Sequence, residues 1–332
     1  QSVLRQVDSV VVKEKAGAFL GKLGAVALGK QNQLYVAELL DARVLEIAPD
    51  GTIAGTFGQK GNGPGELATP GYMTTMGDSL FVNDQSQRRV SVFNTTTRKF
   101  VRNFSTKLPI RRLIANGSEL LALSIDPKTF SPVAVLSPTG EIIRTEGVMP
   151  DFLHQNSVFA STSSSFPVVA RGDDMWGANE YTQSILRWKR GTSVTVEELK
   201  LPVVRRWGVD LETYRQILRD PNDPKVPTLI YKHSFPAELT FVATDILGLL
   251  TFDPTFKDMQ FTGPHHLTLI DIKNKKVCPD IPVPIPTDPQ PKVVLKGDML
   301  VVLQQMGDKS GEIVSAIRRF KIDPKQCVWK SL

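Results

Sequence analysis

The chain has 332 residues, of which 41% are apolar and 22% charged, and 40 basic against 34 acidic side chains leave a net charge of +6. This composition is typical of a globular protein, and no apolar run approaches the ~18–20 residues that span a bilayer. Basic doublets such as Arg88–Arg89 and Arg111–Arg112 are scattered among acidic residues. Because nucleic-acid binding favours a contiguous basic stripe with aromatic residues, we expect no nucleic-acid partner.

The first predicted element is an alternating strand within residues 1–15, which precedes a series of repeats. Six short blocks of shared pattern then recur, each after a short apolar strand and a polar turn, and most lead into a further strand. They lie at residues 32–38, 78–84, 118–124, 173–179, 246–252 and 298–304. Starts about 40 to 70 residues apart with four strands per unit predict an all-β fold, a single six-bladed β-propeller over residues 1–332.

The ends and two insertions complete this plan. The strand in 1–15 has no partner of its own, so we expect it to close the last blade and remove an exposed edge. Segments at about 146–165 and 202–235 interrupt the repeat, and the second carries a helical pattern at about 210–219 that predicts one short inserted helix.

The two cysteines, Cys278 and Cys327, each follow a strand and a turn of the last two repeats. Outer strands of neighbouring blades diverge, and Cα atoms more than about 7 Å apart cannot be bridged. We therefore expect two free thiols. Two thiols without CxxC spacing also lack the ligands of a structural zinc site.

Residues 34–71 contain a strand, a polar turn, an Arg-Val strand and a Gly-rich connection, and residues 80–94 repeat the pattern. These stretches resemble NHL repeats, the units of six-bladed propellers. Later features resemble exported bacterial six-bladed propellers, notably Asn179-Glu180-Tyr181 before the Trp188 strand and Phe235-Pro236 opening the next blade. The resemblance implies a six-bladed propeller fold and an exported location, secreted or periplasmic. A first residue of Gln rather than Met also favours export, because it is typical of a chain from which a signal peptide has been cut. Blades three, five and six lack the Asp-x-x-x-Arg-Val pattern, so no repeated ligand site is implied.

Three apparent motifs are interpreted as structural. The glycines of 58–65 precede a strand rather than a helix, which excludes a dinucleotide fingerprint. Gly77-Asp78-Ser79-Leu80 matches a lipase motif but occupies the slot of a hairpin turn in every aligned repeat. His265 and His266 are adjacent on a strand and face opposite ways, so a His-rich metal site is not expected.

Polar side chains recur where second strands end. Glu38, Asp84, Asn179 and Gln304 occupy these positions, and Asp253 follows the fifth such strand. Six-bladed lactonases bind a divalent cation at their central tunnel through Glu, Asn and Asp, so a resemblance to them implies Ca²⁺ or a similar ion on Glu38, Asp84, Asn179 and Asp253. In the other interpretation these side chains cap turns and pair with Arg43, Arg88 or Arg89.

Two functions follow. The first is an exported, monomeric propeller without catalytic activity or a cofactor, which binds a small molecule, glycan or protein. Its expected binding residues lie on the face of the second-to-third strand loops and in the 202–235 insertion: Glu38, Asp84, Arg88, Asn179, Glu180, Tyr181, Trp207, Tyr214 and Gln304. The alternative is a divalent-cation-dependent hydrolase of the lactonase type, or a lyase, that uses the four metal ligands above.

Overall fold

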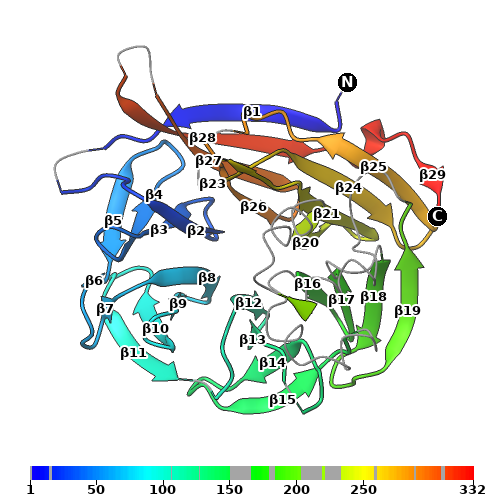
Figure 1. Cartoon of the computed structure of the whole chain (residues 1–332), viewed down its shortest axis with the longest axis horizontal. Coiled ribbons are helices and arrows are strands. Elements are labelled where there is room, and N and C mark those ends of the chain that lie inside the picture. Colours follow the sequence, from blue (N-terminus) through cyan, green and yellow to red (C-terminus); the bar gives the residue numbers. More distant parts are fainter. Residues whose placement is uncertain are drawn as a thin grey trace.

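A computed structural model describes residues 2–14, 17–105, 107–126, 128–149, 166–178, 184–202, 219–220, 233–257, 260–287, 289–307 and 311–332. Within these residues, six sheets of four or five antiparallel strands stand around a common centre in chain order (Figure 1). The predicted all-β, six-bladed propeller is confirmed. The helix expected near 210–219 and most of both insertions lie outside the described residues.

Blades one to three each follow the chain from the inner strand outward. Blade one is β2 (Leu23–Leu28), β3 (Leu34–Glu38), β4 (Arg43–Ile47) and β5 (Ile53–Phe57); blade two is β8 (Pro70–Met76), β9 (Ser79–Asp84), β10 (Arg89–Asn94) and β11 (Phe100–Ser105); blade three is β12 (Arg112–Asn116), β13 (Glu119–Leu123), β14 (Val133–Leu136) and β15 (Ile142–Glu146). Between blades one and two, β6 (Gln59–Lys60) and β7 (Glu66–Leu67) form a short parallel pair.

Blade four is built from consecutive strands, whereas blades five and six include strands from the C-terminal and N-terminal ends of the chain. Blade four is β16 (Val168–Arg171), β17 (Asp174–Ala178), β18 (Ser184–Lys189) and β19 (Thr195–Lys200); blade five is β20 (Phe235–Ala243), β21 (Ile246–Phe252), β24 (His265–Asp271), β25 (Lys276–Pro282) and β29 (Lys330–Ser331); blade six is β26 (Lys292–Lys296), β27 (Met299–Gly307), β28 (Ile313–Ile322) and β1 (Leu4–Val11). The hairpin of β22 (Thr255–Lys257) and β23 (Gln260–Thr262) projects from blade five, and a 3₁₀ turn spans Pro324–Gln326.

Local sequence explains the hairpins between inner and second strands. Gly77, Gly117, Gly172 and Gly297 hold φ between 56° and 59°, the left-handed region that glycine enters without a steric penalty. The Gly77-Asp78-Ser79-Leu80 sequence is therefore a tight turn, with Ser79 as the first residue of β9. The Gly-rich segment 58–65 likewise leads into β7 and then β8, and no helix follows it.

The hydrophobic core is divided into six clusters, each between two neighbouring blades. Blades three and four, for example, pack Leu121, Val133 and Val135 against Met175 and Trp188. Second strands are covered on both faces, and all five residues of β3 are buried. Because each blade buries its faces only against its neighbours, the ring has to close for every cluster to form.

Closure places the N-terminal strand at the outer edge of blade six. β1 pairs antiparallel with β28, from Leu4 opposite Ile322 to Val11 opposite Ala316. The Asp8 carboxylate accepts hydrogen bonds at 3.0 and 3.2 Å from Arg319, whose side chain is only 5% exposed. The pairing satisfies an edge of β28 that would otherwise be open.

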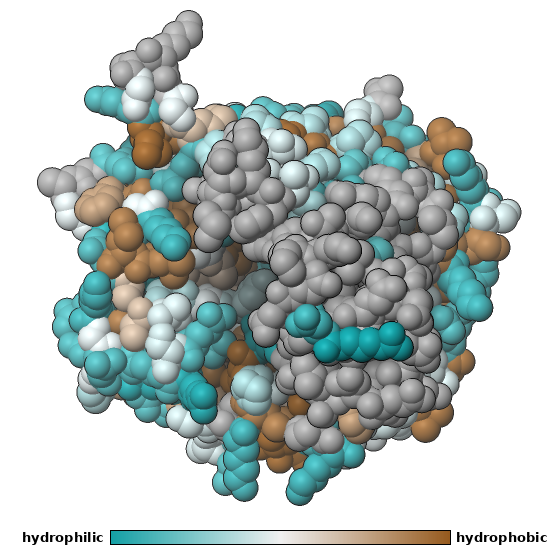
Figure 2. All heavy atoms as spheres, viewed as in Figure 1, coloured by the Kyte–Doolittle hydropathy of each residue, from teal (hydrophilic) through white to brown (hydrophobic). Residues whose placement is uncertain are grey.

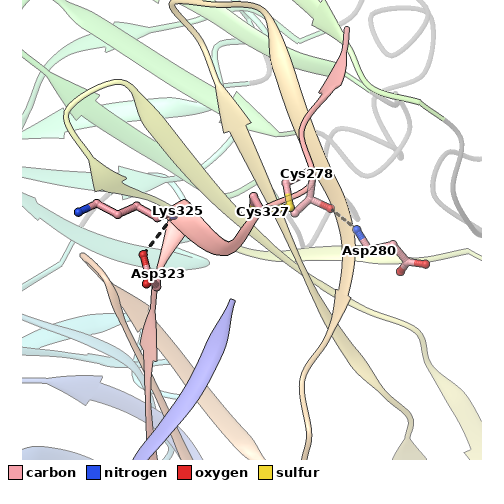
Figure 3. Close-up of a disulfide and its surroundings, with 6 residues drawn as sticks. Cys278, Asp280, Asp323, Lys325 and Cys327 are labelled. Atoms are coloured by element: carbon pink, nitrogen blue, oxygen red, sulfur yellow. Dashed lines mark hydrogen bonds between the residues drawn. A yellow bond between two sulfur atoms is a disulfide. The ribbon is translucent and has the colours of Figure 1, made fainter. Parts of the chain in front are cut away.

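The expectation of two free thiols is wrong. Cys278 on β25 and Cys327 after the 3₁₀ turn form a disulfide, with Cα atoms 5.8 Å apart (Figure 3). The C-terminal segment leaves blade six and crosses to blade five, where β29 adds a fifth strand beside β25. The expectation failed because it placed both cysteines on diverging blade edges, whereas the chain after Asp323 turns back toward β25.

Candidate functional site

A central cavity of about 500 Å³ is lined by the inner strands of blades one, two, three, five and six, and by Phe166 and Pro167 just before the inner strand of blade four. Its walls include three aromatic rings from blades four and five, namely Phe166, Phe235 and Phe252. Figure 2 shows that the visible face of the ring is hollowed beside its centre. We call this space the tunnel cavity.

An ion pair spans the tunnel cavity between blades that are not neighbours. Arg112 on β12 forms a salt bridge with Glu238 on β20 and donates a second hydrogen bond of 2.7 Å to the Ala237 carbonyl. Both charged side chains are less than one-fifth exposed. Burial raises the pKa of the Glu238 carboxyl, and the Arg112 guanidinium opposes that rise. The contact ties blade three to blade five and neutralises both charges.

A second cavity of about 580 Å³ lies between blades two and three, and we call it the basic cleft. Its cations are Arg88 from the turn after β9, and Lys107 and Arg111 from the connection into β12. The other lining residues are neutral: Tyr72, Asn83, Gln85, Leu108, Pro109 and Ile110. Among the described residues, none of the three cations has an ion-pair partner. The cleft is therefore positively charged and uncompensated.

Two neighbours shape the basic cleft. The Asn83 side-chain amide donates a 2.9 Å hydrogen bond to the Ile110 carbonyl and so joins the two walls. Tyr72 lines both the cleft and the tunnel cavity, is 42% exposed, and lies 5.3 Å from the Arg112 guanidinium, measured to the ring centroid. The aromatic ring thus forms the boundary between the two spaces.

The polar residues expected at strand ends hold loops in place. The fully buried Glu38 carboxylate accepts backbone hydrogen bonds from Lys22, Leu40 and Asp41 at 2.9 to 3.2 Å, with Arg43 Nε 3.7 Å away. Arg43, five residues after Glu38, was one of the arginines expected to pair with these acids, and it does so.

Asp84 and Gln304 play comparable parts in blades two and six. The Asp84 carboxylate is fully buried and accepts from the backbone N–H groups of Ala68 at 2.7 Å and Thr69 at 3.1 Å. Gln304 donates to the carbonyls of Pro286 and Pro289 and accepts from Arg318 at 3.0 Å. These contacts fix the connections that enter each blade. Among the described residues, Arg88 forms no ion pair with Asp84, and it lines the basic cleft instead.

Asp253 lies in a polar group in blade five. The buried Ser234 hydroxyl donates to the Asp253 carboxylate, and His266 lies 4.0 Å from Asp253 and 3.9 Å from Asp280. His265 faces the other way, 3% exposed and stacked on Phe252 at 5.0 Å between ring centroids. Burial, with a contribution from His266, lowers the pKa of His265 to about 4, so this imidazole is neutral at pH 7.

Over the described residues, no group of three or more His, Cys, Asp or Glu side chains is placed to hold a metal ion. Glu38, Asp84 and Asp253 are each held by separate partners within their own blade. Asn179, Glu180, Tyr181, Trp207 and Tyr214, the other residues expected at the site, lie outside the described part of the chain.

Several residues of both cavities were missed by sequence reasoning. The sequence shows Arg111 and Arg112 as one of several basic doublets scattered among acidic residues, yet Arg111 lines the basic cleft and Arg112 forms an ion pair across the tunnel. Adjacent side chains of a strand point to opposite sides, so the doublet could have been expected to face two different spaces. No local pattern distinguishes Tyr72 or Glu238 from other strand residues.

Comparisons with known proteins support the fold. No family model and no curated protein matches the chain. A solved protein of Bacteroides fragilis NCTC 9343 whose export is presumed is similar at a TM-score of 0.64 and 12% identity, over 96% of each chain. Virginiamycin B lyase from Staphylococcus aureus is similar at a TM-score of 0.51 and 10% identity, over 96% of this chain and all of that one. At such identities the likeness concerns the fold alone. Within the described residues, no helix is long and apolar enough to cross a membrane.

Proposed function

We propose that this chain is an exported, non-catalytic propeller that binds an acidic saccharide in the basic cleft between blades two and three. The observation that carries the proposal is the cleft's charge: Arg88, Lys107 and Arg111 line it, and none of the described residues in its walls is acidic. A volume of about 580 Å³ lies within the usual range for small-ligand sites.

The neutral walls of the cleft suit a sugar. Tyr72 offers an exposed ring, and Gln85 offers an exposed amide. Guanidinium groups bind carboxylate or sulfate through paired hydrogen bonds, which are about twice as strong as neutral ones. An acidic sugar would supply an anion for the arginines and a ring face for the tyrosine.

Export is supported by the disulfide as well as by the structural likeness. Disulfides persist in oxidising compartments and are rare in the cytosol of mesophiles. Trapping free thiols in cells that make the native protein tests this point, and we expect Cys278 and Cys327 to be oxidised. Free thiols in the native protein would argue for a reducing compartment.

The cation-dependent hydrolase or lyase has less support from the described residues. Its ligands Glu38 and Asp84 would each have to release two or more backbone hydrogen bonds to coordinate an ion. Such buried carboxylate contacts are worth roughly 1.5–3 kcal/mol each, so an ion would first have to compensate for their loss.

Titration calorimetry with trigalacturonate and its neutral counterpart galactotriose tests the binding proposal. We expect trigalacturonate to bind more tightly, with an affinity that falls as salt is added. Arg88→Ala and Arg111→Ala should each weaken binding about tenfold, equal to about 1.4 kcal/mol. Arg5→Ala removes an exposed charge from blade six and serves as the matched control. Equal binding of the two trisaccharides would contradict the proposal.

A further inference from the structure

The tunnel cavity differs from the basic cleft in chemistry. Beside Phe166, Phe235 and Phe252, its walls carry aliphatic side chains from blades one and six, including Val26 and Val293. Its volume of about 500 Å³ is enough for a small organic molecule. Removing apolar ligand surface from water against such walls contributes about 25 cal/mol per Å².

Among the described residues, one cation that lines this cavity has no counter-charge. Arg112 is neutralised by Glu238 across the tunnel. Lys292, the first residue of β26, also lines the cavity, and it has no ion-pair partner in the part of the chain that the structure describes. Burial lowers the pKa of Lys292, and the nearby charge of Lys22 adds to this effect. Gln290, two residues before Lys292, also lines the cavity. Its buried side-chain oxygen has no hydrogen-bond partner among the described residues.

We propose that the tunnel cavity is a second ligand site, which takes an apolar monocarboxylate with its anion on Lys292 and its ring or chain against the phenylalanines. A partly desolvated ammonium without a counter-charge is unfavourable, so a ligand carboxylate relieves that cost. Because the Arg112–Glu238 pair is already neutral, the described lining residues present a single positive charge, that of Lys292. A monoanion matches this charge better than a multiply charged acid.

The site is separate from the basic cleft. Among the described lining residues, only Tyr72 and Gln85 are common to the two spaces, and Lys292 lines the tunnel cavity and not the cleft. The inference therefore does not depend on the acidic saccharide. Variants of Arg88 and Arg111 should leave the tunnel ligand unaffected, so the two proposals fail independently.

Calorimetry with 4-phenylbutyrate and its neutral amide, 4-phenylbutanamide, tests the site on the full chain. We expect the wild-type protein to prefer the carboxylate by about tenfold or more, and Lys292→Met to abolish the preference. Lys296→Met is the matched control: Lys296 lies on the same strand but bonds the Leu28 carbonyl and does not line the cavity. This variant should keep the preference.

A second measurement guards against a folding defect. Labelling of Lys292 by an amine-directed reagent, followed by peptide mass spectrometry, should slow several-fold when 4-phenylbutyrate is present, whereas labelling of Lys296 should not change. The proposal is overturned by equal binding of acid and amide, by no binding of either at millimolar concentration, or by unchanged labelling of Lys292.

Discussion

The disulfide between Cys278 and Cys327 should contribute measurably to the stability of the ring. It closes a loop with a sequence separation of 49 residues, and chain entropy for such a loop corresponds to about 4 kcal/mol at 25 °C. Unfolding 332 residues has an entropy near 0.7 kcal/mol per degree, so loss of the bond should lower Tm by about 6 °C. Cys278 is also buried in the cluster between blades five and six, with Cys327 and Trp329 packed against it.

Calorimetric melting of the oxidised and the fully reduced wild-type protein measures this effect. The two forms differ only in the disulfide bond, because reduction leaves every side-chain heavy atom in place. Cys278→Ala/Cys327→Ala should behave like the reduced protein, apart from the small loss of packing. Hydrogen exchange should also quicken at β29, which pairs with β25 through only two residues. A change in Tm below about 1 °C would show that the C-terminal segment detaches before the ring unfolds, and the loop-entropy reasoning would then be wrong.

Three further predictions concern buried charges and ring closure. The fully buried Glu146 carboxylate accepts hydrogen bonds from Arg144 and Arg190, so Glu146→Gln should lower the free energy of unfolding in urea by about 3–5 kcal/mol. The control Glu119→Gln changes a 31%-exposed partner of the same two arginines and should cost clearly less. Equal losses in the two variants would contradict this prediction. The pKa of His265 falls from 6.5 to about 4 on folding, so the unfolded chain binds more protons than the folded chain between these pH values. Up to about 3 kcal/mol of stability should therefore be lost as the pH drops from 6.5 to 4. A His265→Leu variant whose stability has the same pH dependence would refute this assignment. Deletion of residues 1–11 should expose the edge of β28 and cause aggregation seen by light scattering, whereas a truncated protein that stays monomeric and melts like the parent would count against the closure.

The fold could be predicted because its information is local. Each blade repeats an apolar strand, a turn with glycine in most blades, and a second strand covered on both faces, as in β3. The turn at Gly77 needs a positive φ that glycine supplies, so the hairpin is specified within a few residues. Six such units can bury their faces only by stacking in a ring, and the number of blades follows from the number of repeats.

The candidate site could be predicted only in part. Arg88 was named from the sequence and lines the basic cleft, but Tyr72, Lys107 and Arg111 reach the same space from other segments. Glu38 and Asp84 end their strands as expected, yet the sequence left open whether they face a ligand or the backbone. The structure gives them backbone N–H partners up to 16 residues earlier in the chain.

The sequence by itself determined the secondary structure, the hairpin turns and the sixfold repeat, because these depend on backbone preference and on strand alternation over short stretches. Tertiary structure decided which distant groups meet. Arg112 finds Glu238 across 126 residues, and Cys327 finds Cys278 only because the C-terminal segment crosses from blade six to blade five. Such contacts depend on how whole blades are placed around the ring, and no local pattern encodes that placement.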